Sequence, residues 1–131
     1  ALVHLVGDVH QPMHVGHKSD RGANDVKVKW FREESNLHRV WDSNLIDHQQ
    51  LSFTEFADKI NHPTAAQVTK WQASNPQDWM HESHQIAKKI YASVGDGNFY
   101  YNYAYEYTPV VQERLLQAGI RLAAVLNDLL E

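Results

Sequence analysis

Apolar residues recur at helical spacing along most of this sequence. They stand three or four positions apart in the first ten residues, between about residues 36 and 45, from 76 to 94, and in the last twenty residues. Residues 15–35 differ, because they are rich in glycine, aspartate and asparagine and are typical of a loop. Within this loop, residues 26–30 alternate apolar and polar side chains, which predicts one short strand without an evident hairpin partner. The pattern therefore predicts an all-α fold with one short extended segment.

Start signals for helices divide the middle of the chain. They are two capping boxes and an Asn-Pro pair: Ser52 with Glu55, Thr64 with Gln67, and Asn75 with Pro76. The helix that begins at Pro76 is expected to stop at Gly95. Thr108-Pro109 predicts the start of the last helix, with five apolar residues facing inward: Val111, Leu115, Leu122, Leu126 and Leu129.

The beginning of the sequence lacks a helix start signal. Leu2, Leu5, Val6 and Val9 already show helical spacing, with no capping residue before them. No basic stretch precedes these apolar residues, as it would in a signal peptide. We therefore expect residues 1–131 to form a single domain that is a fragment, with its N-terminal part upstream.

The composition narrows the possible chemistry. The chain has no cysteine, which excludes disulfides, thiolate zinc sites and cysteine nucleophiles. Its net charge of −4 argues against a purely electrostatic nucleic-acid binder. No apolar run approaches the roughly 20 residues that span a bilayer, so no membrane partner is expected. Nine histidines beside sixteen carboxylates supply metal ligands without sulfur.

Two His-x-x-x-Asp pairs carry the candidate chemistry. His4 with Asp8 and His38 with Asp42 are each four residues apart, so each pair shares one face of a helix. His14 follows six residues after Asp8. A single pair of this kind is typical of an exposed salt bridge. Two pairs and a nearby histidine, in a chain without cysteine, favour a metal site.

Two segments resemble the signatures of the S1/P1 nuclease family: residues 4–14 (HLVGDVHQPMH) and residues 36–42 (NLHRVWD). Residues 20–24 resemble the family's Gly-Gly-Asn loop, with Ala23 in place of a glycine. Residues 79–83 and the last helix resemble later family segments, so the resemblance spans essentially the whole chain. It implies the all-α fold that the family shares with zinc-dependent phospholipase C.

The resemblance also implies an activity. Members hold three zinc ions in one cleft and hydrolyse phosphodiester bonds in single-stranded DNA or RNA, and many also remove 3′-phosphates. They are exported, which implies a secreted or periplasmic protein. Carried over by position, His4 and Asp8 would bind the first zinc, with Asp8 also bridging to the third. The second zinc would be held by three residues: His14, His38 and Asp42.

Asn44 matches a family position that contacts the phosphate or the base, so Asp8 and Asn44 are the candidate catalytic residues. A plain helix-surface role for Asn44 remains open. The family's other zinc ligands come from sequence upstream of the first signature. The chain is therefore expected to carry one complete zinc site, to need that upstream part, and to be inactive or nearly so alone. Completion of a site by oligomerisation remains open.

Two other functions remain open. One is a zinc-dependent phospholipase C of the same fold, although those enzymes typically have glutamate where this chain has Asp42. The other is a non-catalytic helical module that has kept a single structural zinc. A fluorogenic lipid assay against a single-stranded DNA assay would separate the two enzymes.

Other polar and aromatic residues have simpler interpretations. We expect a structural role for His10 and a hydrogen bond within its own loop for Asn24. His81, Glu82 and His84 are expected to lie on a solvated helix face. The aromatic segment 99–107 is expected to be ordered by packing, with base stacking as the alternative.

Overall fold

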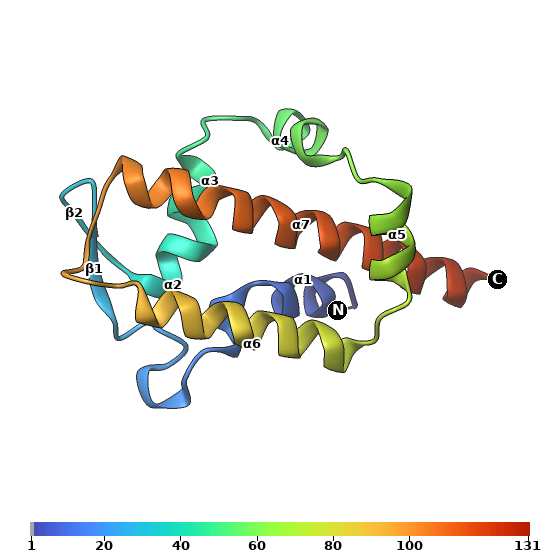
Figure 1. Cartoon of the computed structure of the whole chain (residues 1–131), viewed down its shortest axis with the longest axis horizontal. Helices are drawn as coiled ribbons and strands as arrows, with labels where there is room; N and C mark the ends of the chain where they lie inside the picture. The colour runs from blue at the N-terminus through green and yellow to red at the C-terminus, as the bar shows by residue number, and fades with distance from the viewer. Residues whose placement is uncertain (1) are drawn as a thin grey trace.

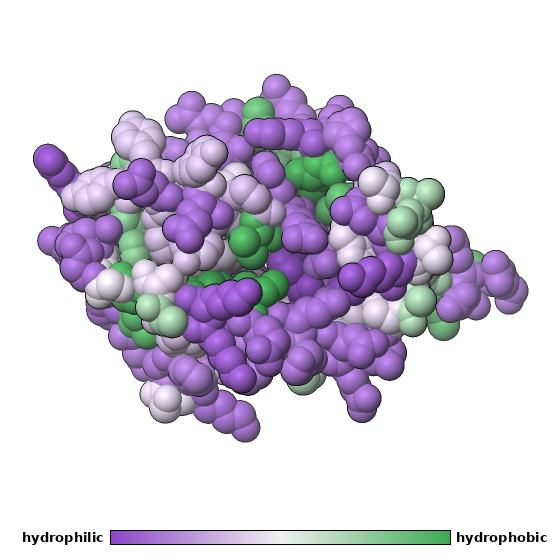
Figure 2. Space-filling model, viewed as in Figure 1, coloured by the Kyte–Doolittle hydropathy of each residue, from purple (hydrophilic) through white to green (hydrophobic). Residues whose placement is uncertain are grey.

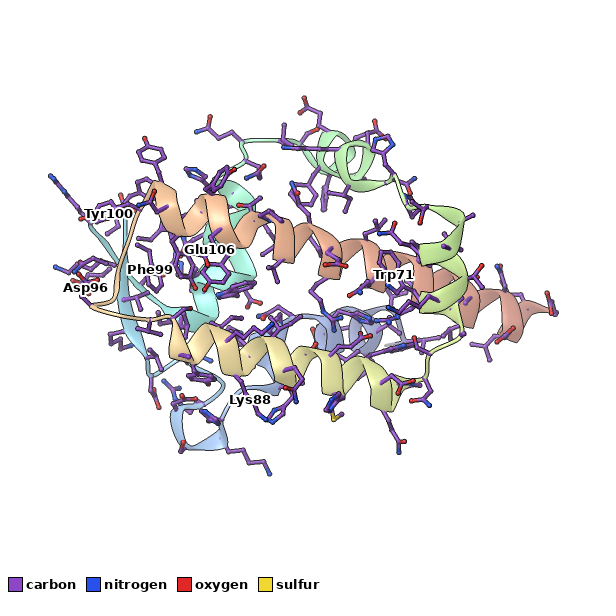
Figure 3. All side chains as sticks on the ribbon, viewed as in Figure 1. Trp71, Lys88, Asp96, Phe99, Tyr100 and Glu106 are labelled. Carbon is purple, nitrogen blue, oxygen red and sulfur yellow. The ribbon has the colours of Figure 1, made fainter. Side chains whose placement is uncertain are left out.

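The computed structural model describes residues 2–131, and helices dominate it (Figure 1). The long helices α6 (Pro76–Ala92) and α7 (Tyr101–Leu130) run in opposite directions, and α1 (Leu2–His10) packs against both. Helices α4 (Phe53–Ile60) and α5 (Ala65–Gln72) pack against α7. Figure 3 shows Trp71 of α5 beside α7, where its side chain is buried. The expected all-α class is confirmed.

Local start signals determine where the middle helices begin. Both predicted capping boxes form, with Ser52 and Thr64 accepting from the backbone of Glu55 and Gln67. Asn75 caps α6 in the same way, and Pro76 occupies its first turn. Such contacts span only three residues, so the local sequence is enough to predict them.

Residues 37–47 form one irregular helix. It begins as α2 (Leu37–Arg39), widens into a π-turn over Val40–Asn44 and ends as α3 (Leu45–Asp47). Its apolar side is fully buried in the core, which also contains Met13 and Ile90. π-turns are rare in proteins as a whole, and those that occur are frequently found at functional sites. This one carries Asp42.

The extended segment is a three-stranded sheet rather than one strand. β1 (Lys27–Trp30) pairs antiparallel with β2 (Glu33–Asn36) and parallel with β3 (Asn98–Phe99). The turn between β1 and β2 consists of Phe31 and Arg32, both left-handed, with φ of 50° and 72°. Asn and Gly normally supply this conformation, so the sequence showed no hairpin. Phe31 compensates by packing on Trp30 and His48.

The last helix begins at Tyr101, not at Thr108 as predicted, and Pro109 lies inside it. An interior proline removes one backbone hydrogen bond, and packing of the preceding aromatic residues offsets that loss. Phe99 stacks on Tyr103 with 3.8 Å between ring centroids, and the indole of Trp41 donates to the Tyr103 hydroxyl at 3.1 Å. The packing interpretation is thus confirmed for these residues, whereas Tyr101 and Tyr105 are 72% and 86% exposed.

The inward face of α7 is also different from the prediction. Val111 is buried, but Leu115, Leu126 and Leu129 are exposed. The buried polar residues of this helix are Arg114, Gln117 and Arg121. Seen from the face in Figure 2, the surface is mostly hydrophilic, with apolar side chains visible in the hollow at its centre. None of the helices described in residues 2–131 is long and apolar enough to cross a membrane.

Candidate metal centre

Three predicted ligands meet at one point of the structure. His14 lies in the 3₁₀ turn Pro12–Val15, which follows α1. His38 lies in α2, and Asp42 lies in the π-turn. The Nε2 atoms of His14 and His38 lie 3.1 Å and 3.0 Å from the two carboxylate oxygens of Asp42. One ligand atom from each residue lies within 4.8 Å of the other two. We call these residues the histidine–aspartate cluster.

Neighbouring groups orient the cluster. The Nδ1 atom of His38 donates to the Gly22 carbonyl oxygen at 2.8 Å, and the Nε2 atom of the same ring faces Asp42. The Gln11 amide donates to Asp42 Oδ1 at 2.7 Å, and its own oxygen accepts from the Met13 backbone. Sequence reasoning missed both supports, although both residues lie in or beside the quoted motifs.

The surroundings of Asp42 favour its charged carboxylate form. Partial burial alone would raise the pKa of Asp42, but the hydrogen bonds from Gln11 and His14 and the nearby His38 together lower it. The oxygens of Asp42 are therefore charged acceptors at ordinary pH, which is the form that binds a cation.

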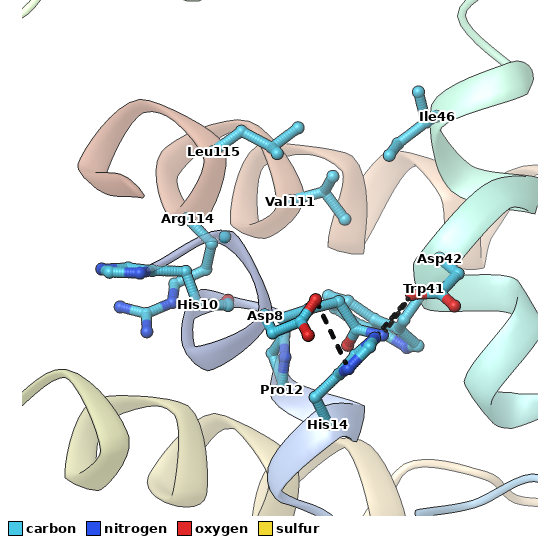
Figure 4. Close-up of a pocket in the computed structure, with 12 residues that line it drawn as sticks. Asp8, His10, Pro12, His14, Trp41, Asp42, Ile46, Val111, Arg114 and Leu115 are labelled. Carbon is cyan, nitrogen blue, oxygen red and sulfur yellow. Dashed lines mark hydrogen bonds and ion pairs between the residues drawn. The ribbon is translucent and has the colours of Figure 1, made fainter. Parts of the chain in front are cut away.

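The second predicted pair lies next to the cluster. Asp8 Oδ1 is 3.8 Å from Nδ1 of His14 (Figure 4). Asp8 Oδ2 is 2.9 Å from Nε2 of His4. The His4 side chain is 77% exposed, so it is not part of a dry core. The structure brings Asp8 to the cluster, and His4 extends the polar surface along α1.

A pocket of about 260 Å³ opens in front of these residues. Its polar side includes Asp8, His14 and Asp42, which Figure 4 labels, and Gln11 also lines it. The rest of the lining is largely apolar and includes Trp41, Ile46, Val111 and Leu115, with Arg114 also present. The two carboxylates favour a cation at the polar side, and the apolar residues can contact a nonpolar part of a ligand.

Asn44 occupies a different position. Its amide oxygen accepts a hydrogen bond from the Ser35 hydroxyl at 2.8 Å. Among the residues described, those lining the pocket do not include Asn44. Its contact with a phosphate or a base stays a prediction.

A second set of polar side chains joins α6 and α7 to the C-terminal end of α1. Arg121 contacts both carboxylate oxygens of Glu82, at 2.6 and 2.9 Å, and Arg114 contacts the same carboxylate at 2.8 Å. His81 and His84 are exposed as expected, whereas Glu82 is only partly exposed because both arginines of α7 reach it. Arg121 also contacts His10 Nε2 at 3.0 Å. We call Arg114, Arg121, Glu82 and His10 the arginine network.

The arginine network holds the end of α1. Arg114 donates to the backbone carbonyl of His10, and the Ser83 hydroxyl donates to that of Val9. His10 is buried, which lowers its pKa to about 4 and keeps it neutral, as its expected structural role requires. Sequence reasoning missed the two arginines, although their seven-residue spacing puts both on one helix face.

Comparison with known proteins agrees with this geometry. This chain matches the S1/P1 nuclease family model over residues 1–131. The chain is 35% identical to Endonuclease 2 of Arabidopsis thaliana over 95% of this chain and 48% of that protein. It is 25% identical to Nuclease S1 of Aspergillus oryzae over 96% of this chain and 52% of that protein. The chain belongs to the S1/P1 nuclease family.

A more distant similarity is to a phospholipase C, the class of enzyme named above as an alternative. The chain is 26% identical to a phospholipase C of Bacillus cereus, over 73% of this chain and 28% of that protein. The chain spans about half the length of the curated endonucleases and Nuclease S1 that it matches.

Proposed function

We propose that this chain forms part of a zinc-dependent nuclease that hydrolyses phosphodiester bonds in single-stranded DNA or RNA. The observation that carries the proposal is the convergence of His14, His38 and Asp42 at the mouth of an open pocket. Membership of the S1/P1 nuclease family supports the same function.

The cluster suits zinc. Ligand atoms bound tetrahedrally at about 2.0–2.2 Å lie roughly 3.3–3.6 Å apart. The two histidine nitrogens lie 3.1 and 3.0 Å from the Asp42 oxygens, so small adjustments would accommodate the ion. Two imidazoles and one carboxylate are also a common catalytic zinc set, which leaves a coordination position open.

The chain's own residues have separable roles in this proposal. His14, His38 and Asp42 would hold the zinc, and Gln11 would orient the Asp42 carboxylate. When bound, zinc supplies Lewis acidity toward a phosphoryl oxygen and lowers the pKa of water. It would also attract phosphate to a chain whose net charge is −4.

His4 and Asp8 are proposed ligands of a neighbouring zinc. Asp8 lies between His4 and His14, and by resemblance its carboxylate would also bridge to the third zinc. By resemblance, the remaining ligands of that site and of a third come from a preceding segment. We therefore propose that this chain alone cleaves nucleic acid poorly, and that the whole protein is exported.

The test is cleavage of fluorogenic single-stranded DNA in the presence of zinc. The chain would be assayed alone and with the segment that precedes the matched half in its relatives, supplied as a separate polypeptide. We expect activity only in the mixture, and loss of it with Asp8→Ala or His38→Ala. Robust cleavage by the chain alone would contradict the two-part proposal.

A lipid phosphodiesterase assay on the same mixture separates the alternative. The similarity to a phospholipase C makes this alternative specific. Cleavage of a fluorogenic phospholipid without cleavage of DNA would replace the nuclease with a phospholipase C.

A further inference from the structure

We propose that Tyr91 and Asp20 are positioning residues for the metal ligand His38. The inference rests on the proposed zinc site. It concerns the loop of residues 16–25, whose Gly22 carbonyl is the hydrogen-bond partner of His38 Nδ1. That contact decides which ring nitrogen of His38 faces the cluster, because a carbonyl oxygen can only accept.

The Gly22 carbonyl is presented by an unusual backbone. Arg21, Gly22 and Ala23 are all left-handed, with φ of 55°, 65° and 70°. Only glycine adopts this region freely, so two of the three positions are strained. A strained run of this kind persists only where surrounding contacts hold it.

Asp20 supplies one such contact. Its Oδ1 atom accepts from the backbone N–H of Ala23 at 2.7 Å, which closes the loop across the left-handed residues. The same oxygen accepts from the hydroxyl of Tyr91, on α6, at 3.0 Å. Asp20 therefore connects the loop that supports His38 to a long helix of the core.

Tyr91 connects to the other end of the loop as well. Its hydroxyl oxygen accepts from the backbone N–H of His17 at 3.1 Å. The His17 ring packs on the Tyr91 ring, with 4.2 Å between centroids. One hydroxyl thus holds the entrance of the loop through His17 and its left-handed run through Asp20.

Two glycines show how closely the loop is fitted. A Cβ atom at Gly16 would lie 2.8 Å from the Tyr91 hydroxyl. A Cβ atom at Gly22 would lie 2.7 Å from the carbonyl oxygen of Met13, the residue before His14. The loop therefore lies against both Tyr91 and the segment that carries His14, so its position affects two of the three cluster residues.

The path of support runs from Tyr91 to Asp20, through the left-handed loop to Gly22, and on to His38. A partner that directly orients a metal-ligating histidine affects metal affinity by about 10–100-fold when it is lost. Tyr91 acts further from the ligand, so we expect the lower end of that range, about 10-fold, for loss of its hydroxyl.

The test uses Tyr91→Phe, which keeps the ring against His17 and removes only the hydroxyl. Asp20→Ala removes the shared acceptor, whereas Asp20→Asn keeps an oxygen that can accept both hydrogen bonds. Tyr105→Phe is the matched control, because Tyr105 is 86% exposed. Zinc affinity would be measured by competition with a chelator, and the His38 tautomer by ¹⁵N NMR of the metal-free chain.

We expect Tyr91→Phe and Asp20→Ala to weaken zinc binding about 10-fold and to reduce the Nδ1–H tautomer of His38. Asp20→Asn should restore both properties, and Tyr105→Phe should change neither. Unchanged affinity and tautomer in Tyr91→Phe and Asp20→Ala, whatever their melting temperatures, would overturn the inference. Failure of the wild-type chain to bind zinc would instead overturn the proposed function, and the tautomer would still decide the role of Tyr91.

Discussion

The histidine–aspartate cluster and the arginine network lie on either side of the end of α1, and they differ in how their charges are satisfied. Arg114 and Arg121 are only 4% and 1% exposed, and their donors reach carboxylate, carbonyl and hydroxyl oxygens. In residues 2–131, every buried side-chain nitrogen and oxygen has a hydrogen-bond partner. The cluster instead gathers two imidazoles and a partly exposed carboxylate at a pocket.

This difference separates a structural polar group from a binding one. Buried charges that are fully paired gain nothing from a ligand, and they fix the elements that supply them. A carboxylate and imidazoles that converge at an open surface can bind a cation. The arginine network should therefore govern folding, and the cluster should govern zinc binding.

The largest expected effect is that of Arg121→Ala on folding. The substitution leaves Glu82 with one arginine, removes the partner of His10 and opens a cavity in the core. We expect the free energy of unfolding to fall by about 4 kcal/mol, measured by urea denaturation. The exposed Arg32→Ala variant should change it by less than about 0.5 kcal/mol. A similar, small loss in both variants would break the comparison.

The next effect is the pH dependence of stability that His10 confers. Its pKa is about 4 in the folded chain and near 6.5 when unfolded, so the unfolded chain binds more protons between these values. Stability should therefore fall as the pH drops from 6.5 to 4, by up to about 3 kcal/mol. Denaturation of the metal-free chain at several pH values measures this. In His10→Gln the part of the slope due to His10 should vanish, and an unchanged slope would exclude His10 as its source.

Substitutions in the histidine–aspartate cluster should affect zinc binding rather than folding. His38→Ala and Asp42→Asn each remove one of three zinc ligands, so zinc affinity should fall by at least about 100-fold, or about 2.7 kcal/mol. Stability without zinc should change by less than about 1 kcal/mol. Chelator competition and metal-free denaturation give the two numbers, with His62→Ala as the exposed control. Equal zinc affinity in all variants would mean that the ion binds elsewhere.

The smallest effect concerns the strained turn that precedes His38. Arg32 is exposed and left-handed, so Arg32→Gly should relieve strain and stabilise the chain by about 0.5–1 kcal/mol. Arg32→Ala keeps a Cβ in the same conformation and should show no such gain. Zinc affinity should be equal in both, as measured by the same competition assay. A change of affinity would mean that the turn, and not only the loop before it, supports the cluster.

Local features of this protein were predictable from its sequence. The capping boxes at Ser52 and Thr64 involve contacts across three residues, and the His4–Asp8 and His38–Asp42 pairs contacts across four. Helical geometry alone brings such residues together. The two His-x-x-x-Asp segments also identified the family correctly, because their residue types and spacing are specific.

Tertiary structure decided what depends on distant partners. The start of α7 is set by the stacking of Phe99 and Tyr103 and by Trp41, which offset the proline inside the helix. The burial of Arg121 instead of the leucines depends on Glu82, 39 residues away in the sequence. Burial of a charge is favourable only where a distant chain segment supplies its partner, and helical periodicity carries no information about that partner.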